Sequence, residues 1–67
     1  MQFKEIRKEN GFTQQRLAQE LNVKQSTIAM WETGKAVPCT KNLSILSELL
    51  GVSMSDLWKS FPKRSTP

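Results

Sequence analysis

The chain contains no histidine, one cysteine, and only three glycines and three prolines among its 67 residues. Without histidine it lacks the usual metal ligand and the usual general base at neutral pH. The single cysteine, Cys39, excludes an intramolecular disulfide bond and any zinc site built from several cysteines. Because glycine and proline are few and charges of both signs are mixed, the composition indicates a folded domain rather than a disordered chain.

The chain also lacks a long hydrophobic run. No stretch approaches the ~20 apolar residues that a membrane-spanning helix needs. The first residues, Met1 to Lys4, do not contain the apolar segment of a signal peptide. We therefore expect a cytoplasmic protein that does not enter a membrane.

Catalytic patterns are missing as well. The sequence has no histidine to activate a serine, no glycine-rich phosphate loop and no cluster of metal ligands. A serine–lysine pair is the remaining catalytic option, but a bundle of this size offers little room for a substrate pocket. The sequence thus predicts a protein that is not an enzyme and that uses no cofactor or metal.

Positive charge is present in excess, and its distribution is uneven. Ten basic residues against six acidic ones give a net charge of +4. Residues 42–58 contain Glu48 and Asp56 but no lysine or arginine. A chain with one basic side and one neutral to acidic side is suited to approaching phosphate groups from the basic side.

Apolar residues recur at helical spacing in five segments, and no segment has the alternation of a strand. The helix-starting residues Thr13, Thr40 and Ser53 and the helix-ending Gly34 and Gly51 separate these segments. We expect helices at about 3–9, 14–21, 25–33, 41–50 and 53–58. The predicted fold class is all-α, a compact five-helix domain over residues 1–61, followed by a flexible tail at 62–67.

Residues 13–34 are the most informative part of the chain. Leu17 and Leu21 form one apolar stripe, and Ile28 and Trp31 form a second one beyond a sharp elbow at Asn22. The outward positions after the elbow carry residues that need no burial: Lys24, Gln25, Ser26, Ala29 and Met30. A helix that packs its apolar face against the rest of the protein and presents polar groups at its N-terminal end suits the major groove of DNA.

These residues and their spacing resemble the Cro/phage-repressor (Xre-type) helix-turn-helix family over about residues 3–57. The signature consists of Thr13-Gln14, Leu17-Ala18, Val23, Ile28, Trp31-Glu32, Gly34, Pro38, Leu50-Gly51-Val52-Ser53 and Leu57. The resemblance implies a lambda-repressor-like fold with the helix at 25–33 in the major groove. It also implies that the protein binds double-stranded DNA as a homodimer.

The resemblance assigns roles to individual positions. Arg7 and Glu32 match a structural ion pair of the family, although the sequence leaves the burial of this pair open. Positions that face base edges are occupied by Gln25, Ser26, Thr27 and Met30. Positions near the DNA backbone are occupied by Gln14, Thr33 and Lys35, and we add Lys24 at the entry to the same helix.

Side-chain chemistry refines these roles. The amide of Gln25 can bind N6 and N7 of adenine together, and the hydroxyl of Ser26 can serve several bases. Met30 could rest against a thymine methyl group or simply cover part of Trp31. Lys24 could reach a phosphate or a guanine, and a phosphate contact is favoured because it needs less geometric precision.

The fourth helix suggests a dimer surface. Leu43, Leu46 and Leu50 share the face expected to enter the core, whereas Ile45 and Leu49 lie off it. Trp58 and Phe61 are further apolar residues beyond the core residue Leu57, so these four side chains form the predicted interface. The alternative is a broad apolar stripe that wraps a small core.

The sequence therefore predicts a sequence-specific DNA-binding regulator, a repressor that binds a two-fold operator as a homodimer. The main alternative is the antitoxin of a toxin–antitoxin pair, in which Trp58, Phe61 and the tail bind the toxin. A third reading is a helical interaction domain that has lost DNA binding.

Overall fold

The computed structural model describes residues 2–62, and this part of the chain contains five helices and no strand. The helices are α1 (Phe3–Glu9), α2 (Gln14–Leu21), α3 (Gln25–Thr33), α4 (Thr40–Leu50) and α5 (Met54–Ser60). The all-α class and the five-helix arrangement are thus confirmed. Most of the predicted tail, residues 63–67, lies outside the described residues.

Local capping explains where most helices begin and end. The Thr13 hydroxyl accepts a hydrogen bond from the Arg16 backbone N–H at 3.0 Å and starts α2. The Ser53 hydroxyl does the same for the Asp56 N–H at 3.1 Å and starts α5. Asn22 adopts the left-handed conformation, with φ of 57°, and this permits the sharp elbow between α2 and α3.

The start of α4 differs from the prediction. Cys39 is the capping residue, and Thr40 is the first helical residue rather than the cap. The Cys39 carbonyl accepts the first hydrogen bond, from the Leu43 N–H at 2.8 Å, so the helix begins one residue earlier than expected. The helix α5 likewise continues two residues further, to Ser60.

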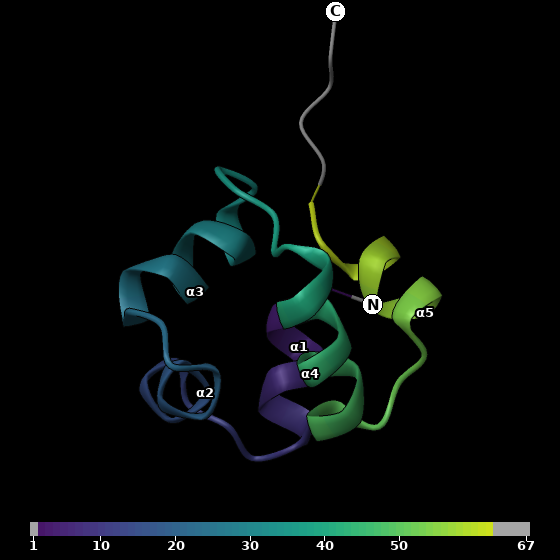
Figure 1. Cartoon of the computed structure of the whole chain (residues 1–67), viewed down its shortest axis with the longest axis horizontal. Helices are drawn as coiled ribbons and strands as arrows, with labels where there is room; N and C mark the ends of the chain where they lie inside the picture. The colour runs from purple at the N-terminus through teal and green to yellow at the C-terminus, as the bar shows by residue number, and fades with distance from the viewer. Residues whose placement is uncertain (1, 63–67) are drawn as a thin grey trace, which may run out of the picture.

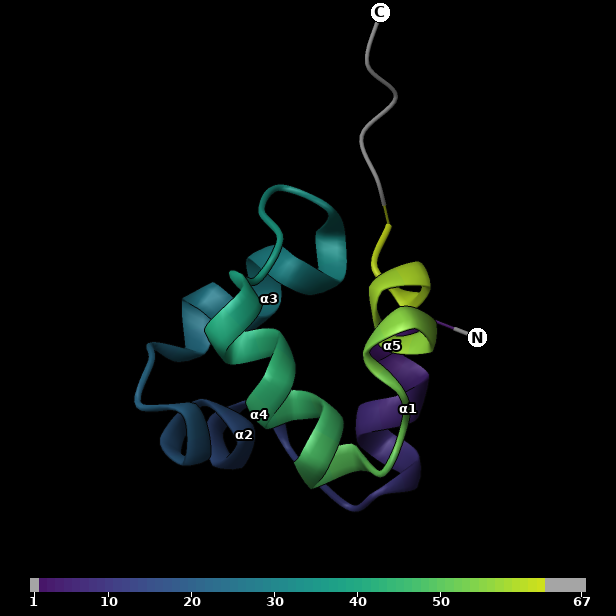
Figure 2. The same ribbon diagram turned by 45° about the vertical axis from the view of Figure 1, so that its right-hand side comes forward.

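Helices α2 and α3 lie together on one side of the molecule and α5 lies on the other side, with α4 between them (Figure 1, Figure 2). All five helices contribute apolar side chains to one core. The side chains with the least exposure are Phe3, Leu17, Ile28, Leu46 and Leu57. Because the core draws on every helix, it fixes how α3 is presented at the surface.

Phe61 corrects one expectation. It is 2% exposed and therefore belongs to the core, not to an exposed dimer surface. Its ring stacks on Phe3, with centroids 4.5 Å apart, and meets Trp31 edge-on at 6.4 Å. After α5 the backbone becomes extended at Phe61, with φ of −82° and ψ of 135°, and the ring packs between these distant partners.

Within residues 2–62 no helix is both long and apolar enough to cross a membrane.

Candidate nucleic-acid interface

Helix α3 has one face in the core and one in solvent. Ile28 and Trp31 are buried, with 0% and 3% of their surface exposed. At the N-terminal end of the helix, Gln25 and Ser26 are both exposed. The polar end of α3 is therefore accessible while its apolar side is held by the other helices.

The other predicted DNA-contacting residues lie along α3 or next to its two ends, except Gln14 at the start of α2. Thr27 is half-buried, and Met30 is 39% exposed. Lys24 and Lys35 are exposed and stand just before and just after α3. A nine-residue helix spans about 13 Å, so these two lysines stand near its opposite ends.

Thr33, the last residue of α3, uses its hydroxyl within the helix. The hydroxyl donates to the Ala29 carbonyl at 3.1 Å and lies 3.3 Å from the Met30 carbonyl. Because a hydroxyl has one proton to donate, Thr33 can meet an outside group as an acceptor or after it breaks this local bond.

A hollow of about 570 Å³ opens where the end of α1 meets the starts of α2 and α3. It is lined by Arg7, Lys8, Gly11, Phe12, Thr13, Gln14, Gln15 and Gln25. From the resemblance to the phage repressors we expect a DNA phosphate to bind in this region, at the start of α2. Thr13 already accepts from the Arg16 N–H, and the other N–H groups that a helix leaves unpaired in its first turn, together with the nearby Lys8, suit an anion.

Arg7 and Glu32 form the ion pair that the resemblance implied, and the pair is buried. The Arg7 Nε donates to Glu32 Oε2 at 2.6 Å, and the two side chains are 7% and 5% exposed. The Arg7 Nη1 also donates to the Phe12 carbonyl at 2.6 Å. One guanidinium thus ties α1, the loop before α2 and the C-terminal part of α3 together.

Gln14 joins this pair to the exposed end of α3. Its Nε2 donates to Glu32 Oε1 at 2.9 Å, and its Oε1 accepts from Gln25 Nε2 at 3.3 Å. From the sequence we expected only a contact between Gln14 and the DNA backbone, and neither of these two bonds. The partners are 18 and 11 residues away, so no local spacing pattern could have indicated them.

Three of the four residues predicted for the dimer surface remain at least partly accessible. Ile45 and Leu49 are half-buried against the core, and Trp58 is 37% exposed. Met54, one turn before Trp58 on α5, adds another exposed apolar side chain at 37%. The burial of Phe61 removes one of the two aromatic residues on which the antitoxin alternative relied.

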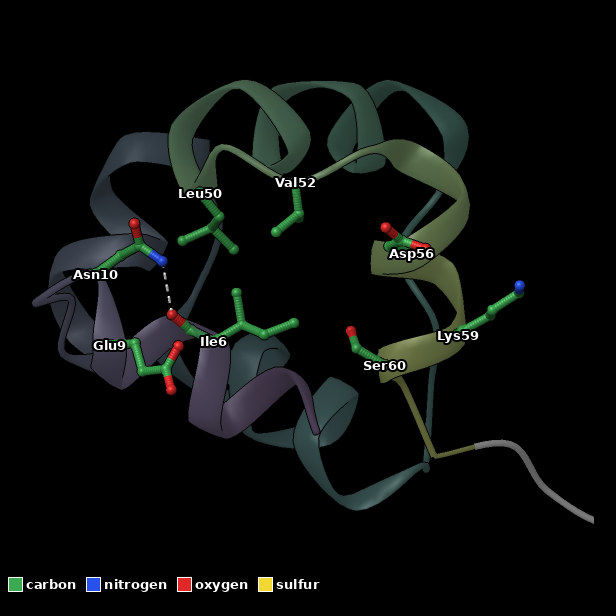
Figure 3. A pocket seen from close by; sticks show the side chains of 8 residues that line it. All are labelled: Ile6, Glu9, Asn10, Leu50, Val52, Asp56, Lys59 and Ser60. Atoms are coloured by element: carbon green, nitrogen blue, oxygen red, sulfur yellow. Dashed lines mark hydrogen bonds between the residues drawn. The ribbon is translucent and has the colours of Figure 1, made fainter. Parts of the chain in front are cut away.

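A second hollow, of about 520 Å³, lies away from α3 (Figure 3). The side chains of Ile6, Leu50 and Val52 point into it from α1, the end of α4 and the following loop. Glu9 and Asp56 stand at its rim, on α1 and α5 respectively. This hollow includes none of the residues predicted to contact DNA.

Comparison with known proteins is consistent with this geometry. A helix-turn-helix family model matches residues 3–57, which span α1 through the middle of α5. No solved structure gives a significant match.

Two curated relatives also match. An uncharacterized HTH-type transcriptional regulator, YonR, derived from the SPbeta prophage of Bacillus subtilis (strain 168), is 41% identical over 56 residues. The HTH-type transcriptional activator BcrR of Enterococcus faecalis is 32% identical over 53 residues. The matches cover 84% and 79% of this chain but only 52% and 26% of the two relatives. Both relatives are named as regulators, in agreement with the prediction that the chain is not an enzyme.

Proposed function

The chain belongs to the Cro/phage-repressor (Xre-type) helix-turn-helix family, and on this basis we propose that it is a DNA-binding transcriptional regulator that reads double-stranded DNA with α3. The observation that carries the proposal is the two-sided character of α3. Ile28 and Trp31 anchor the helix in the core, while Gln25 and Ser26 stand exposed at its N-terminal end. A major groove admits one such helix, N-terminal residues first.

In this proposal one set of residues contacts the bases and a second set contacts the DNA backbone. Bases are read by Gln25, Ser26, Thr27 and Met30. The DNA backbone is held by Gln14, Lys24, Thr33 and Lys35. Backbone contacts fix the register of the protein on the duplex, and base contacts select the sequence.

Selection of bound sequences from a random pool tests the proposal, followed by titration of Gln25→Ala on the selected operator. The loss of a bidentate base contact should cost about 1–3 kcal/mol and relax the preference at one base pair. The matched control is Gln19→Leu, an exposed glutamine of α2 outside the proposed interface, which should bind like the wild type. An equal loss of affinity on every operator variant would contradict base reading by Gln25.

We further propose that the protein binds as a homodimer through the surface formed by Ile45, Leu49 and Trp58. Two copies of α3 would then enter successive major grooves ~34 Å apart on a two-fold operator. This surface lies in the segment 42–58, which contains acidic but no basic residues. In a dimer whose paired surface faces away from DNA, these acidic residues would not repel the phosphates.

Leu49→Glu tests the dimer. A carboxylate on the half-buried position should shift sedimentation towards the monomer, whereas Ser44→Glu on the exposed side of α4 should not. An unchanged mass for a folded Leu49→Glu variant would remove α4 from the interface.

The proposed effect on transcription is repression, because a dimer bound over an operator occupies DNA that polymerase needs. A reporter gene placed behind the selected operator tests this effect. Expression should fall when the protein is supplied and recover with Gln25→Ala. Increased expression would instead indicate an activator, as the name of the Enterococcus faecalis relative states for that protein.

A further inference from the structure

We propose that the hollow between α1, the end of α4 and α5 is a binding site for a small amphipathic cation, a primary ammonium group carried on a short apolar chain. The hollow includes none of the residues proposed to contact DNA, so this inference goes beyond the proposed function and does not depend on it. The size of the hollow, its apolar floor and the chemistry of its polar groups together define this class of ligand.

The size and the floor of the hollow suit a small organic molecule. Its volume of about 520 Å³ lies within the range of ligand-binding pockets. The side chains of Ile6, Leu50 and Val52 point into it (Figure 3). Ile6 and Leu50 belong to the core and Val52 packs against it, so the fold holds this floor in place. An apolar chain that lies on the floor would be removed from water.

Two carboxylates flank the apolar floor. Glu9 lies on the α1 side of the hollow and Asp56 on the α5 side (Figure 3). Within residues 2–62 neither carboxylate takes part in an ion pair. Lys59 also lines the hollow, but its ammonium group extends away from it in Figure 3. The hollow therefore presents negative charge beside apolar surface.

A further acceptor comes from Ser60, which lines the hollow and is only 3% exposed. Its hydroxyl donates to the Leu57 carbonyl at 2.5 Å. Because a hydroxyl carries one proton, the Ser60 oxygen can only accept from a group in the hollow. The Asn10 amide nitrogen likewise already donates one hydrogen, to the Ile6 carbonyl at 2.9 Å. An ammonium group, with three donors and no acceptor, matches such a set of acceptors.

Anionic and neutral ligands match the hollow less well. A carboxylate ligand would meet Glu9 and Asp56 with charge of the same sign. A neutral hydroxyl has one hydrogen to donate, and hydrogen bonds between neutral groups are weaker than bonds to an ionised group. The chain as a whole carries a net charge of +4 and repels cations. Binding of an ammonium ligand would therefore have to come from this local site.

The test uses the full chain and three probes of equal chain length: hexylammonium, hexanol and hexanoate. Methyl resonances of Ile6, Leu50 and Val52, followed by NMR during titration, give the dissociation constants. Hexylammonium should shift them saturably and bind at least about fivefold more tightly than hexanol, because its bonds to carboxylates are charge-assisted. Hexanoate should not bind. Equal affinities for hexylammonium and hexanol overturn the proposal, and so does the absence of saturable shifts.

The double variant Glu9→Gln with Asp56→Asn removes both charges and keeps the size of the side chains. In this variant the preference for hexylammonium over hexanol should fall to about twofold or less. The matched control is Glu20→Gln, which removes an exposed carboxylate of α2 outside the hollow and should keep the wild-type preference. A preference that survives in the double variant overturns the proposal. Circular dichroism checks folding, and if the double variant is unfolded, Glu9→Gln at an exposed position decides the question.

A lysine side chain of a partner protein carries the same ammonium group, so a fourth probe separates the two sources. N-acetyl-lysine N-methylamide has two polar amides at the base of its chain, and these amides would lose hydrogen bonds to water on an apolar floor. It should bind more weakly than hexylammonium. Binding that is as tight or tighter would overturn the small-molecule site in favour of a docked lysine.

Discussion

Arg7→Met removes the guanidinium of the buried ion pair while it keeps most of the aliphatic side chain. The variant leaves the Glu32 carboxylate, 5% exposed, with the Gln14 amide as its remaining donor in the network described above. It also leaves the Phe12 carbonyl without its 2.6 Å bond. Breaking one partner of a buried pair typically costs about 3–5 kcal/mol, because the other charge stays in a poorly solvated place.

That cost is large for a chain of this size. At roughly 0.05–0.15 kcal/mol per residue, the free energy of unfolding of the whole domain is about 3–10 kcal/mol. A loss of about 1 kcal/mol lowers the melting temperature of a small domain by about 4–8 °C. Arg7→Met should therefore lower it by about 12 °C at least, and a marginal domain would be largely unfolded at room temperature.

Urea and thermal unfolding, followed by circular dichroism and by the fluorescence of the buried Trp31, measure this cost. The matched control is Arg16→Met, which breaks the exposed pair with Glu20, where the side chains are 65% and 39% exposed. An exposed pair contributes about 1 kcal/mol or less. A second control, Arg7→Met with Glu32→Met, should regain stability because neither charge remains buried. Equal costs for Arg7→Met and Arg16→Met would refute the reasoning.

Three further predictions follow from the same structure. Phe61→Ala should cost about 3–5 kcal/mol in urea unfolding, since it empties a core position; a cost below about 1 kcal/mol would contradict its burial. Gly34→Ala should destabilise more than Gly51→Ala, because both residues have positive φ but only at Gly34 would the new Cβ lie 3.2 Å from a backbone oxygen, that of Pro62. Equal melting temperatures would argue against that contact. Lys35→Ala should weaken binding to all DNA sequences alike and reduce the salt slope by about one; a loss confined to one operator would refute a backbone role.

Helix boundaries could be predicted closely from the sequence because their signals are local. Thr13 and Ser53 accept a hydrogen bond from the backbone three residues ahead, and Asn22 and Gly34 tolerate the left-handed conformation. Where the signal was ambiguous, between Cys39 and Thr40, the boundary was wrong by one residue. The buried and exposed faces of α3 could also be predicted from the sequence, because helical periodicity alone separates them.

The contacts between residues far apart in the sequence could not be predicted from local signals. Phe61 lies beyond the periodic part of α5, and its partners Phe3 and Trp31 belong to the first and third helices. Only the three-dimensional path of the chain brings them together. The bonds of Gln14 to Glu32 and Gln25 have the same origin. Arg7 with Glu32 was foreseen only because the family resemblance supplied the pairing.

The division of α3 into a fixed and an accessible edge bears on how such a regulator can acquire new targets. Substitutions at exposed positions usually change stability by less than about 0.5 kcal/mol, so replacing Ser26 or Met30 should leave folding almost untouched. Under the proposed function, mutations at most of the outer positions of α3 should therefore change the DNA sequence that is bound with little loss of stability. Gln25 is different, because its amide is bonded to Gln14. Any replacement of Gln25 also removes its bond to Gln14, so under the proposed function a change of the base selected at this position would affect both glutamines.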